Sequence, residues 1–400
     1  MRKIAIILVA ALMFTLIGCS KTQTEIPPKK ETPVIIEKTE DEILLEKVDE
    51  MMSEMSLDEK IAQMLIIQYS GYTISDKLLE EIKTVQPGGF ILFANNISTF
   101  ENTKVFVETL QENSKIPMIM SIDQEGGKVQ RMSELADATY IPDMNTLGST
   151  QNYELAQEVG SVMAKEMRTI GVNTVFAPVV DILSAKSKTV LGTRSFGSSA
   201  ELVSNMAKSV AFGLEQNGVI ATYKHFPGLG DTSTDSHKSL PVLNKTLDEL
   251  KNKELIPYEN AIKNGAKIIM VGHVAVPKVT GDNTPASLSE VIVTDILREQ
   301  MGYNGLVVTD ALNMGAITNN YTQEEMYVKA VNAGCDLLLM PNDSKKAIET
   351  IRENISEERI NESVKRILFF KLKYLADYEQ LDKSYLGCEA HKAVIDKIKN

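Results

Sequence analysis

Short apolar runs alternate with amphipathic stretches along most of the chain. The runs are apolar throughout instead of alternating, which is typical of strands that are buried on both faces of a sheet. The stretches between them carry apolar residues at helical spacing. The eight predicted strands lie at 64–69, 89–93, 117–123, 174–181, 219–225, 267–274, 305–310 and 336–340. The clearest predicted helices lie at 152–170, 200–216, 247–264, 323–332 and 357–376.

This alternation of strands and helices predicts an α/β fold, a (β/α)8 TIM barrel in a single domain at 48–376. Two capping boxes, Ser56 with Glu59 and Ser98 with Glu101, indicate early helix starts. An open, doubly wound sheet is the alternative. Against it, no G-x-G-x-x-G fingerprint follows the first strand, and the chain has no Walker A motif.

The N-terminus has the pattern of a bacterial lipoprotein signal peptide at residues 1–18. Arg2 and Lys3 form a basic start, and the apolar run 4–17 is too short for a typical membrane span. The run ends in a small residue followed by Cys19, which resembles a lipobox. We therefore expect Cys19 to be acylated and to become the new N-terminus. An ordinary secretory signal with an incidental cysteine is the alternative.

The segments on either side of the barrel differ from it in composition. Residues 19–47 are rich in Lys, Glu, Thr and Pro, and we expect the lipidated Cys19 and a flexible tether there. Residues 377–400 are charged and weakly patterned, and we expect a C-terminal tail. The predicted location is outside the cytoplasm, with the protein bound to the bacterial cell membrane through its lipid anchor.

Composition narrows the range of partners. The net charge of −12 argues against nucleic acid as a ligand and against electrostatic docking on anionic lipid, because both need clustered Lys and Arg. The chain has no tryptophan, so any sugar-stacking surface must come from Tyr, Phe or aliphatic side chains. The three cysteines have no CxxC spacing and predict neither a metal site nor a disulfide framework. We expect a monomer.

Charged and polar residues follow several of the predicted strands. In a barrel of this type the carboxyl ends of the strands meet at one face, where the active site lies. Burying so many charges without a ligand or partner costs several kcal/mol each. The alternative is that the residues pair with one another and close the mouth of the barrel. They are Asp123, Arg131, Asp181, Arg194, Lys224, His225, His273 and Asp310.

Asp310 and the nearby pair of Asp235 and His237 suggest chemistry. Asp310 ends a buried strand, which holds a nucleophile more rigidly than a loop does. The alternative for Asp310 is a helix cap. Asp235 stands two residues before His237 in a loop, where a carboxylate can orient an imidazole and favour its protonated form. A nucleophile with a proton donor and acceptor is what retaining glycoside hydrolysis needs.

A metal site is the rival for these histidines. His225, His237 and Asp231 provide ligand types that zinc accepts. Lys224 stands next to His225, however, and a lysine is a poor neighbour for a cation. We therefore expect no metal and no cofactor.

Several motifs resemble those of bacterial β-N-acetylglucosaminidases of glycoside hydrolase family 3, over about residues 50–375. They are DQEGGKVQR (123–131), LGTRSFG (191–197), KHFPGLGDT (224–232) with DSH (235–237), and TDALNM (309–314). The match departs at Leu229, where many relatives carry His, and this affects the loop and the leaving group more than the reaction.

The resemblance implies metal-free, two-step retaining hydrolysis that removes terminal β-linked N-acetylglucosamine from cell-wall fragments. It implies that Asp310 is the nucleophile and that His237, oriented by Asp235, is the acid/base. The residues that it implies for sugar binding are Asp123, Arg131, Arg194, Lys224 and His225. The alternatives are a phosphorylase of the same fold and a non-catalytic, sugar-binding lipoprotein.

Overall fold

The eight predicted strands form one parallel sheet that closes on itself. In the computed structural model, which describes residues 38–398, the strand order is β10-β1-β2-β3-β6-β7-β8-β9. The two ends of this order meet where Val308 pairs with Leu337, so the sheet is a barrel. The barrel strands are β1 (Leu65–Ile67), β2 (Gly89–Leu92), β3 (Ile119–Ile122), β6 (Thr174–Val175), β7 (Ile220–Phe226), β8 (Ile268–Val271), β9 (Leu306–Thr309) and β10 (Leu338–Leu339).

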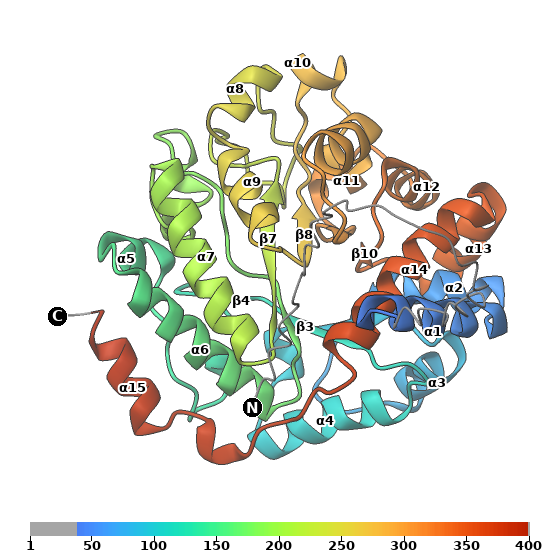
Figure 1. Cartoon of the computed structure of the whole chain (residues 1–400), viewed down its shortest axis with the longest axis horizontal. Coiled ribbons are helices and arrows are strands. Elements are labelled where there is room, and N and C mark those ends of the chain that lie inside the picture. The colour runs from blue at the N-terminus through green and yellow to red at the C-terminus, as the bar shows by residue number, and fades with distance from the viewer. Residues whose placement is uncertain (1–37, 399–400) are drawn as a thin grey trace, which may run out of the picture. The chain divides into compact units, whose positions relative to one another are not determined.

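Helices surround the barrel (Figure 1). The α-helices are α1 (Glu40–Glu54), α2 (Leu57–Gln63), α3 (Asp76–Val85), α4 (Phe100–Glu112), α5 (Met144–Ser149), α6 (Tyr153–Thr169), α7 (Ala200–Gln216), α8 (Leu247–Lys251), α9 (Ile256–Lys263), α10 (Pro277–Thr280), α11 (Gly315–Thr318), α12 (Gln323–Ala333), α13 (Ser344–Asn354), α14 (Glu357–Tyr374) and α15 (Glu389–Asp396).

Shorter elements fill the connections between strands and helices. A small antiparallel hairpin of β4 (Gln124–Gly126) and β5 (Val129–Gln130) follows β3. One connection is a π-helix, η6 (Val291–Gln300). The 3₁₀ turns are η1 (Ala94–Asn96), η2 (Arg131–Glu134), η3 (Ser187–Thr189), η4 (Gly192–Arg194), η5 (Ala286–Leu288) and η7 (Lys383–Tyr385). Eight parallel strands in a closed order, with helices around them, confirm the predicted (β/α)8 barrel.

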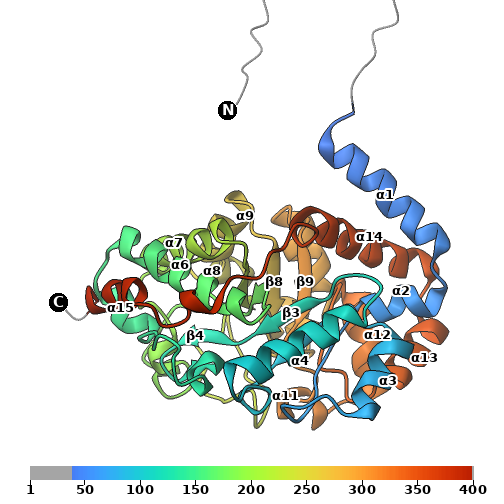
Figure 2. The same cartoon turned by 90° about the horizontal axis from the view of Figure 1, so that it is seen from below.

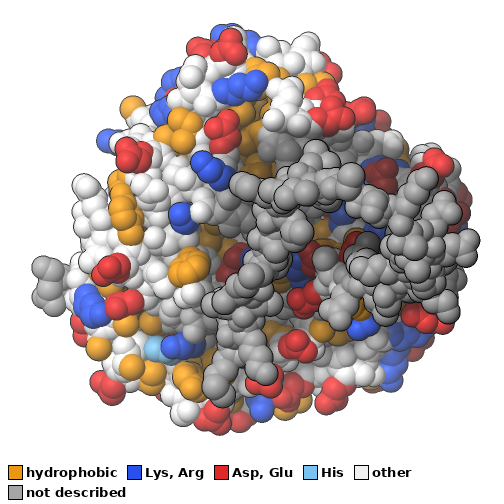
Figure 3. Space-filling model, viewed as in Figure 1, with side chains coloured by type: hydrophobic (Ala, Val, Ile, Leu, Met, Phe, Trp, Pro, Cys, Tyr) orange, Lys and Arg blue, Asp and Glu red, His pale blue; other side chains and the backbone are white. Residues whose placement is uncertain are grey.

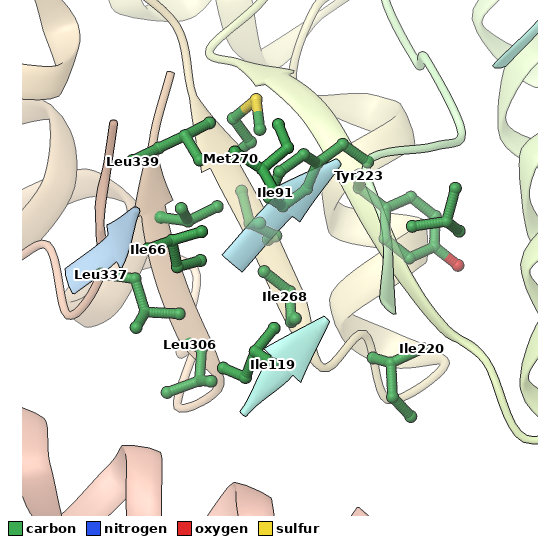
Figure 4. Packing of buried hydrophobic residues seen from close by; sticks show 14 of the residues in the cluster. Ile66, Ile91, Ile119, Ile220, Tyr223, Ile268, Met270, Leu306, Leu337 and Leu339 are labelled. Carbon is green, nitrogen blue, oxygen red and sulfur yellow. The ribbon is translucent and has the colours of Figure 1, made fainter. Parts of the chain in front are cut away.

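The interior of the barrel is filled by aliphatic side chains. Ile66, Ile91, Ile119, Met270 and Leu306 are at most 2% exposed and come from five different strands. Figure 4 shows them gathered between the strands. This packed layer leaves the carboxyl ends of the strands as the place where polar side chains can converge.

Local sequence signals explain most helix ends. Ser56 and Glu59 form the predicted capping box of α2. The second predicted box is wrong by one residue, because Thr99 and not Ser98 caps α4. The predicted helix at 247–264 is two helices, since Pro257 opens α9 and cannot continue α8.

A helix occupies part of the segment that the sequence predicts to be a tether. The predicted tether reaches residue 47, but α1 starts at Glu40 and contacts α14. Val48 of α1 is fully buried, and Lys373 of α14 lies 2.6 Å from the Asp41 carboxylate. Burial of one apolar position and cross-helix ion pairs therefore outweigh the polar composition of this segment. The predicted signal peptide, Cys19 and the rest of the tether lie outside the described residues.

The C-terminal segment is also more ordered than predicted. Residues 377–400 contain α15, which contacts α6 (Figures 1 and 2). His391 Nδ1 lies 2.9 Å from the buried Glu166 carboxylate, which also accepts the Gly387 N–H at 3.0 Å. A single buried carboxylate on α6 thus fixes a segment whose own pattern is weak.

Acidic, basic and hydrophobic side chains are interspersed on the uncovered part of the face in Figure 3. Over residues 38–398, none of the helices has the length and apolar character required to cross a lipid bilayer.

Lys371 is a buried charge in the outer layer. Its side chain is 2% exposed on α14 and donates to the Gln63 side-chain oxygen at 2.7 Å. Loss of water lowers the pKa of Lys371 to about 7. The folded protein therefore releases this proton near pH 7, while the unfolded chain holds it until about pH 10.5. The cost of burying the charge is full below pH 7 and disappears as the pH rises toward 10.

We expect Lys371→Met to raise stability by about 2 to 4 kcal/mol at pH 6, and this gain to shrink as the pH approaches 10. Thermal melts of both proteins across this pH range measure the difference. The control is Lys373→Met, a partly exposed lysine on the same helix, for which the difference should stay flat between pH 6 and 9. A stability difference between Lys371→Met and the wild type that does not change with pH would contradict the lowered pKa of Lys371.

Candidate active site

Two cavities with shared lining residues lie at the carboxyl ends of the barrel strands. Their volumes are about 220 Å³ and about 240 Å³. Apolar side chains such as Phe93, Phe176 and Met340 line the smaller one. The larger one is lined by every residue for which the family resemblance implies a catalytic or sugar-binding role: Asp123, Arg131, Arg194, Lys224, His225, Asp235, His237 and Asp310.

A network of ion pairs forms one wall. Lys224 of β7 lies 2.9 Å from Asp123 and 2.6 Å from Glu125, which follow β3 in the chain. Arg194 binds Glu125 through two nitrogens, at 2.7 and 2.8 Å. Arg131 lies 3.5 Å from Asp123. The charges therefore do pair with one another, as the alternative interpretation expected, yet a cavity remains between them.

The network fixes the charge of each member. Burial alone would raise the pKa of the Glu125 carboxyl, but Arg194 and Lys224 hold it well below its usual range. Burial would lower the pKa of Lys224, but Asp123 and Glu125 raise it above its usual value. Asp123 keeps a side-chain exposure of 19%, so this carboxylate can still meet a ligand.

His225 is held by a second buried carboxylate. Its Nδ1 lies 2.8 Å from Asp181 Oδ2. The other oxygen of Asp181 accepts the backbone N–H of Leu229 at 2.6 Å. Asp181 therefore connects the end of β7 to the loop that follows this strand. Leu229 takes part through its backbone N–H, so this contact does not depend on the leucine side chain.

Asp310 lies directly after β9, is half-buried, and lines both cavities. Its Oδ1 accepts the Ala311 N–H at 2.8 Å, and the next helix, α11, is capped at Met314. The helix-cap alternative for Asp310 is therefore wrong. Burial would raise the pKa of Asp310, but the His225 imidazole and the Ala311 N–H hold it below its usual value. The group is a carboxylate at neutral pH.

His237 lies on an exposed loop and lines the same two cavities as Asp310. Asp235 Oδ1 accepts the backbone N–H of His237 at 3.0 Å and lies 3.0 Å from its ring Nδ1. These contacts lower the pKa of Asp235, so the residue facing the ring is a carboxylate. With Nδ1 engaged, Nε2 is the ring nitrogen that remains for chemistry in the cavity.

His273, at the end of β8, is a buried imidazole beside Asp310. Its Nε2 lies 3.0 Å from the Ala311 carbonyl oxygen and its Nδ1 lies 2.7 Å from Ser287 Oγ. A carbonyl only accepts, so Nε2 carries the proton and Nδ1 accepts from the serine. Burial lowers the pKa of His273, and the ring is neutral at pH 7.

The three groups of the rival zinc site do not converge. His225 pairs with Asp181, while Asp231 lies 3.1 Å from Lys186 and 3.8 Å from Lys245. Between residues 38 and 398, no three His, Cys, Asp or Glu side chains gather in a way that could hold a metal ion.

The sequence analysis assigns no catalytic or binding role to two residues that organise the site, Glu125 and Asp181. Glu125 and Asp181 are 1% exposed, and each fixes one or more of the predicted residues. Glu125 stands two positions after Asp123 in a short hairpin, and Asp181 ends a predicted strand. Carboxylates at strand ends were the available signal, but their partners lie far away in the chain.

The chain is similar to named carbohydrate-active proteins. The sequence profile "Glycosyl hydrolase family 3 N terminal domain" matches residues 56–370. "Beta-hexosaminidase A" of Pseudoalteromonas piscicida is 31% identical over 373 residues, which are 82% of this chain and 62% of that protein. The chain thus spans less than two thirds of the length of that relative. "Beta-hexosaminidase" of Idiomarina loihiensis is 32% identical, over 75% of this chain and 92% of that protein.

The fold also matches solved structures. One is the glycoside hydrolase family 3 beta-N-acetylglucosaminidase from Paenibacillus sp. str. FPU-7, with 34% identity and a TM-score of 0.82. The match covers 86% of this chain and 68% of that one. The family profile matches most of this chain, and the Idiomarina loihiensis protein is 32% identical to it over 92% of its own length. This chain therefore belongs to glycoside hydrolase family 3.

Proposed function

We propose that the protein is a retaining exo-β-N-acetylglucosaminidase that removes terminal β-linked N-acetylglucosamine. The observation that carries the proposal is the joint position of Asp310 and His237, which line the same two cavities at the carboxyl end of the barrel. Family membership and the names of the relatives support the same reaction.

In the first step, the Asp310 carboxylate attacks the anomeric carbon of the bound sugar. The bond from that carbon to the leaving oxygen breaks, and His237 donates the Nε2 proton to this oxygen. The ionised state of Asp310 suits it to attack. The Asp235 carboxylate stabilises the charged imidazole before transfer and holds the ring tautomer.

In the second step, water replaces the aglycone. Neutral His237 takes a proton from the water, the oxygen of the water attacks the anomeric carbon, and the bond to Asp310 breaks. The enzyme returns with Asp310 ionised and His237 protonated. Neither step uses a metal ion or a cofactor.

Sugar binding falls to the charged wall of the cavity. Asp123 and Lys224 can accept from and donate to sugar hydroxyls, and Arg194 and His225 line the same space. Arg131 lines the same cavity, and its side chain is 28% exposed, so its guanidinium can also meet a ligand oxygen. Cavities of about 220 and 240 Å³ suit one terminal sugar, which supports exo action.

The N-terminal sequence suggests where the enzyme works. A lipidated Cys19 would anchor the protein at the outer surface of the cytoplasmic membrane, and cell-wall fragments are the β-linked N-acetylglucosamine substrates found there. Acyl-chain labelling of the wild-type protein and of Cys19→Ala, followed by fractionation, tests this part. Equal membrane recovery of both proteins would contradict it.

We expect Asp310→Ala to lower hydrolysis of an aryl β-N-acetylglucosaminide by at least about 10⁴-fold, because no covalent intermediate can form. Added azide should restore turnover and yield a glycosyl azide. The control is Asp248→Ala, which removes an exposed carboxylate on α8 and should leave the rate unchanged. A fluorinated N-acetylglucosamine donor should label Asp310. Label on another residue would overturn the assignment.

We expect His237→Ala to discriminate between leaving groups. The value of kcat/KM should fall by about 10² to 10⁴ for a poor leaving group and much less for dinitrophenol, which needs no proton. Kinetics with a series of aryl glycosides measures the difference. Equal losses across the series would show that His237 is not the acid.

The same assays separate a hydrolase from a phosphorylase. In phosphate buffer a hydrolase releases free N-acetylglucosamine, whereas a phosphorylase releases the sugar 1-phosphate. Binding of the sugar with no turnover in either buffer would instead indicate the non-catalytic alternative.

A further inference from the structure

The loop that carries His237 is fastened to the helix that follows Asp310. Three consecutive carbonyl groups of the loop, those of residues 236–238, each accept a hydrogen bond from α11 or its first flanking residue. The donors are the Ala316 N–H to Ser236 at 3.0 Å, the Gly315 N–H to His237 at 3.3 Å and the Asn319 side chain to Lys238 at 3.0 Å. The loop and the segment after Asp310 are therefore in direct backbone contact.

Gly315 stands at the centre of this contact. A Cβ placed on Gly315 would lie 2.7 Å from the His237 carbonyl oxygen and 3.0 Å from that of Lys238. Both neighbours are backbone atoms, so the loop itself would have to move. The φ of Gly315 is not in the left-handed region, so its torsions do not require glycine. Close approach of the loop is what requires it.

The position of the His237 ring depends on this contact more than on its own packing. The side chain is 73% exposed, so few neighbours hold the ring. Its restraints come from within the loop, where Asp235 holds the ring and the backbone of His237. A shift of the 235–238 turn therefore shifts the imidazole as well, while Asp310 stays fixed by β9 and the Ala311 N–H.

We infer that Gly315 is a positioning residue that sets the distance between the acid/base loop and the nucleophile. This inference rests on the proposed function of His237. Filling the position with a methyl group pushes the turn away by a fraction of an ångström to about 1 Å, and misplacement of that size costs up to about 10²-fold in rate. This displacement should slow only the steps that need the proton of His237.

The test is Gly315→Ala in the full chain, with kcat/KM measured for aryl β-N-acetylglucosaminides. We expect a loss of about 10- to 100-fold for a poor leaving group and less than about threefold for dinitrophenol. Labelling of Asp310 by a fluorinated donor with an activated leaving group should keep its rate. A role in stability alone would move all three rates together.

Two further variants serve as a control and as an independent test of the loop contact. Ala316→Gly changes the same helix without adding an atom, and we expect equal, small effects on all leaving groups. Asn319→Ala removes the bond to the Lys238 carbonyl from an exposed position, and it should reproduce the selective loss at about two- to fivefold even if Gly315→Ala does not fold.

The outcomes separate the two hypotheses. If His237→Ala shows no dependence on the leaving group, the acid/base assignment itself is wrong. If His237→Ala is selective but Gly315→Ala and Asn319→Ala lower all rates equally or not at all, the acid/base assignment stands and the positioning role of Gly315 is overturned.

Discussion

The site depends on the ion pairs that the buried carboxylate of Glu125 makes. This carboxylate is bound by Arg194 through two nitrogens and by Lys224 through a third, and all of these groups come from different parts of the barrel rim. A carboxylate buried without partners costs several kcal/mol, so Glu125 can be buried because Arg194 and Lys224 pair with it. It holds Lys224 beside Asp123 and so sets the shape of the polar wall.

The two groups proposed for the chemistry are placed by opposite means. Asp310 follows β9, which pairs with β8 on one side and with Leu337 on the other. Its half-buried carboxylate interacts electrostatically with His225 and His273. His237 lies on an exposed loop and is positioned by Asp235 and by backbone contacts to α11. The proposed nucleophile is thus held by the end of a strand, and the proposed proton donor by hydrogen bonds of its loop.

The sequence predicted the barrel well because its strands are continuous apolar runs, as burial on both faces requires. It also predicted which strand ends carry the polar residues of the cavity, such as Lys224 and Asp310. It could not predict Glu125 as the centre of an ion network, because Arg194 approaches it from 69 residues away. Likewise α1 has a polar, tether-like composition, and only its contact with α14 reveals it as a helix.

Glu166 gives the end of the chain a role that its composition hides. This one carboxylate accepts the N–H of Thr139, in the segment after Arg131, as well as that of Gly387, and it meets the ring of His391. A chain cut after α14 would keep the carboxylate but lose two of these three partners. The segment around Thr139 and the C-terminal helix α15 therefore share one buried anion, and a chain shortened at its far end would leave that anion with the Thr139 N–H alone of these three partners.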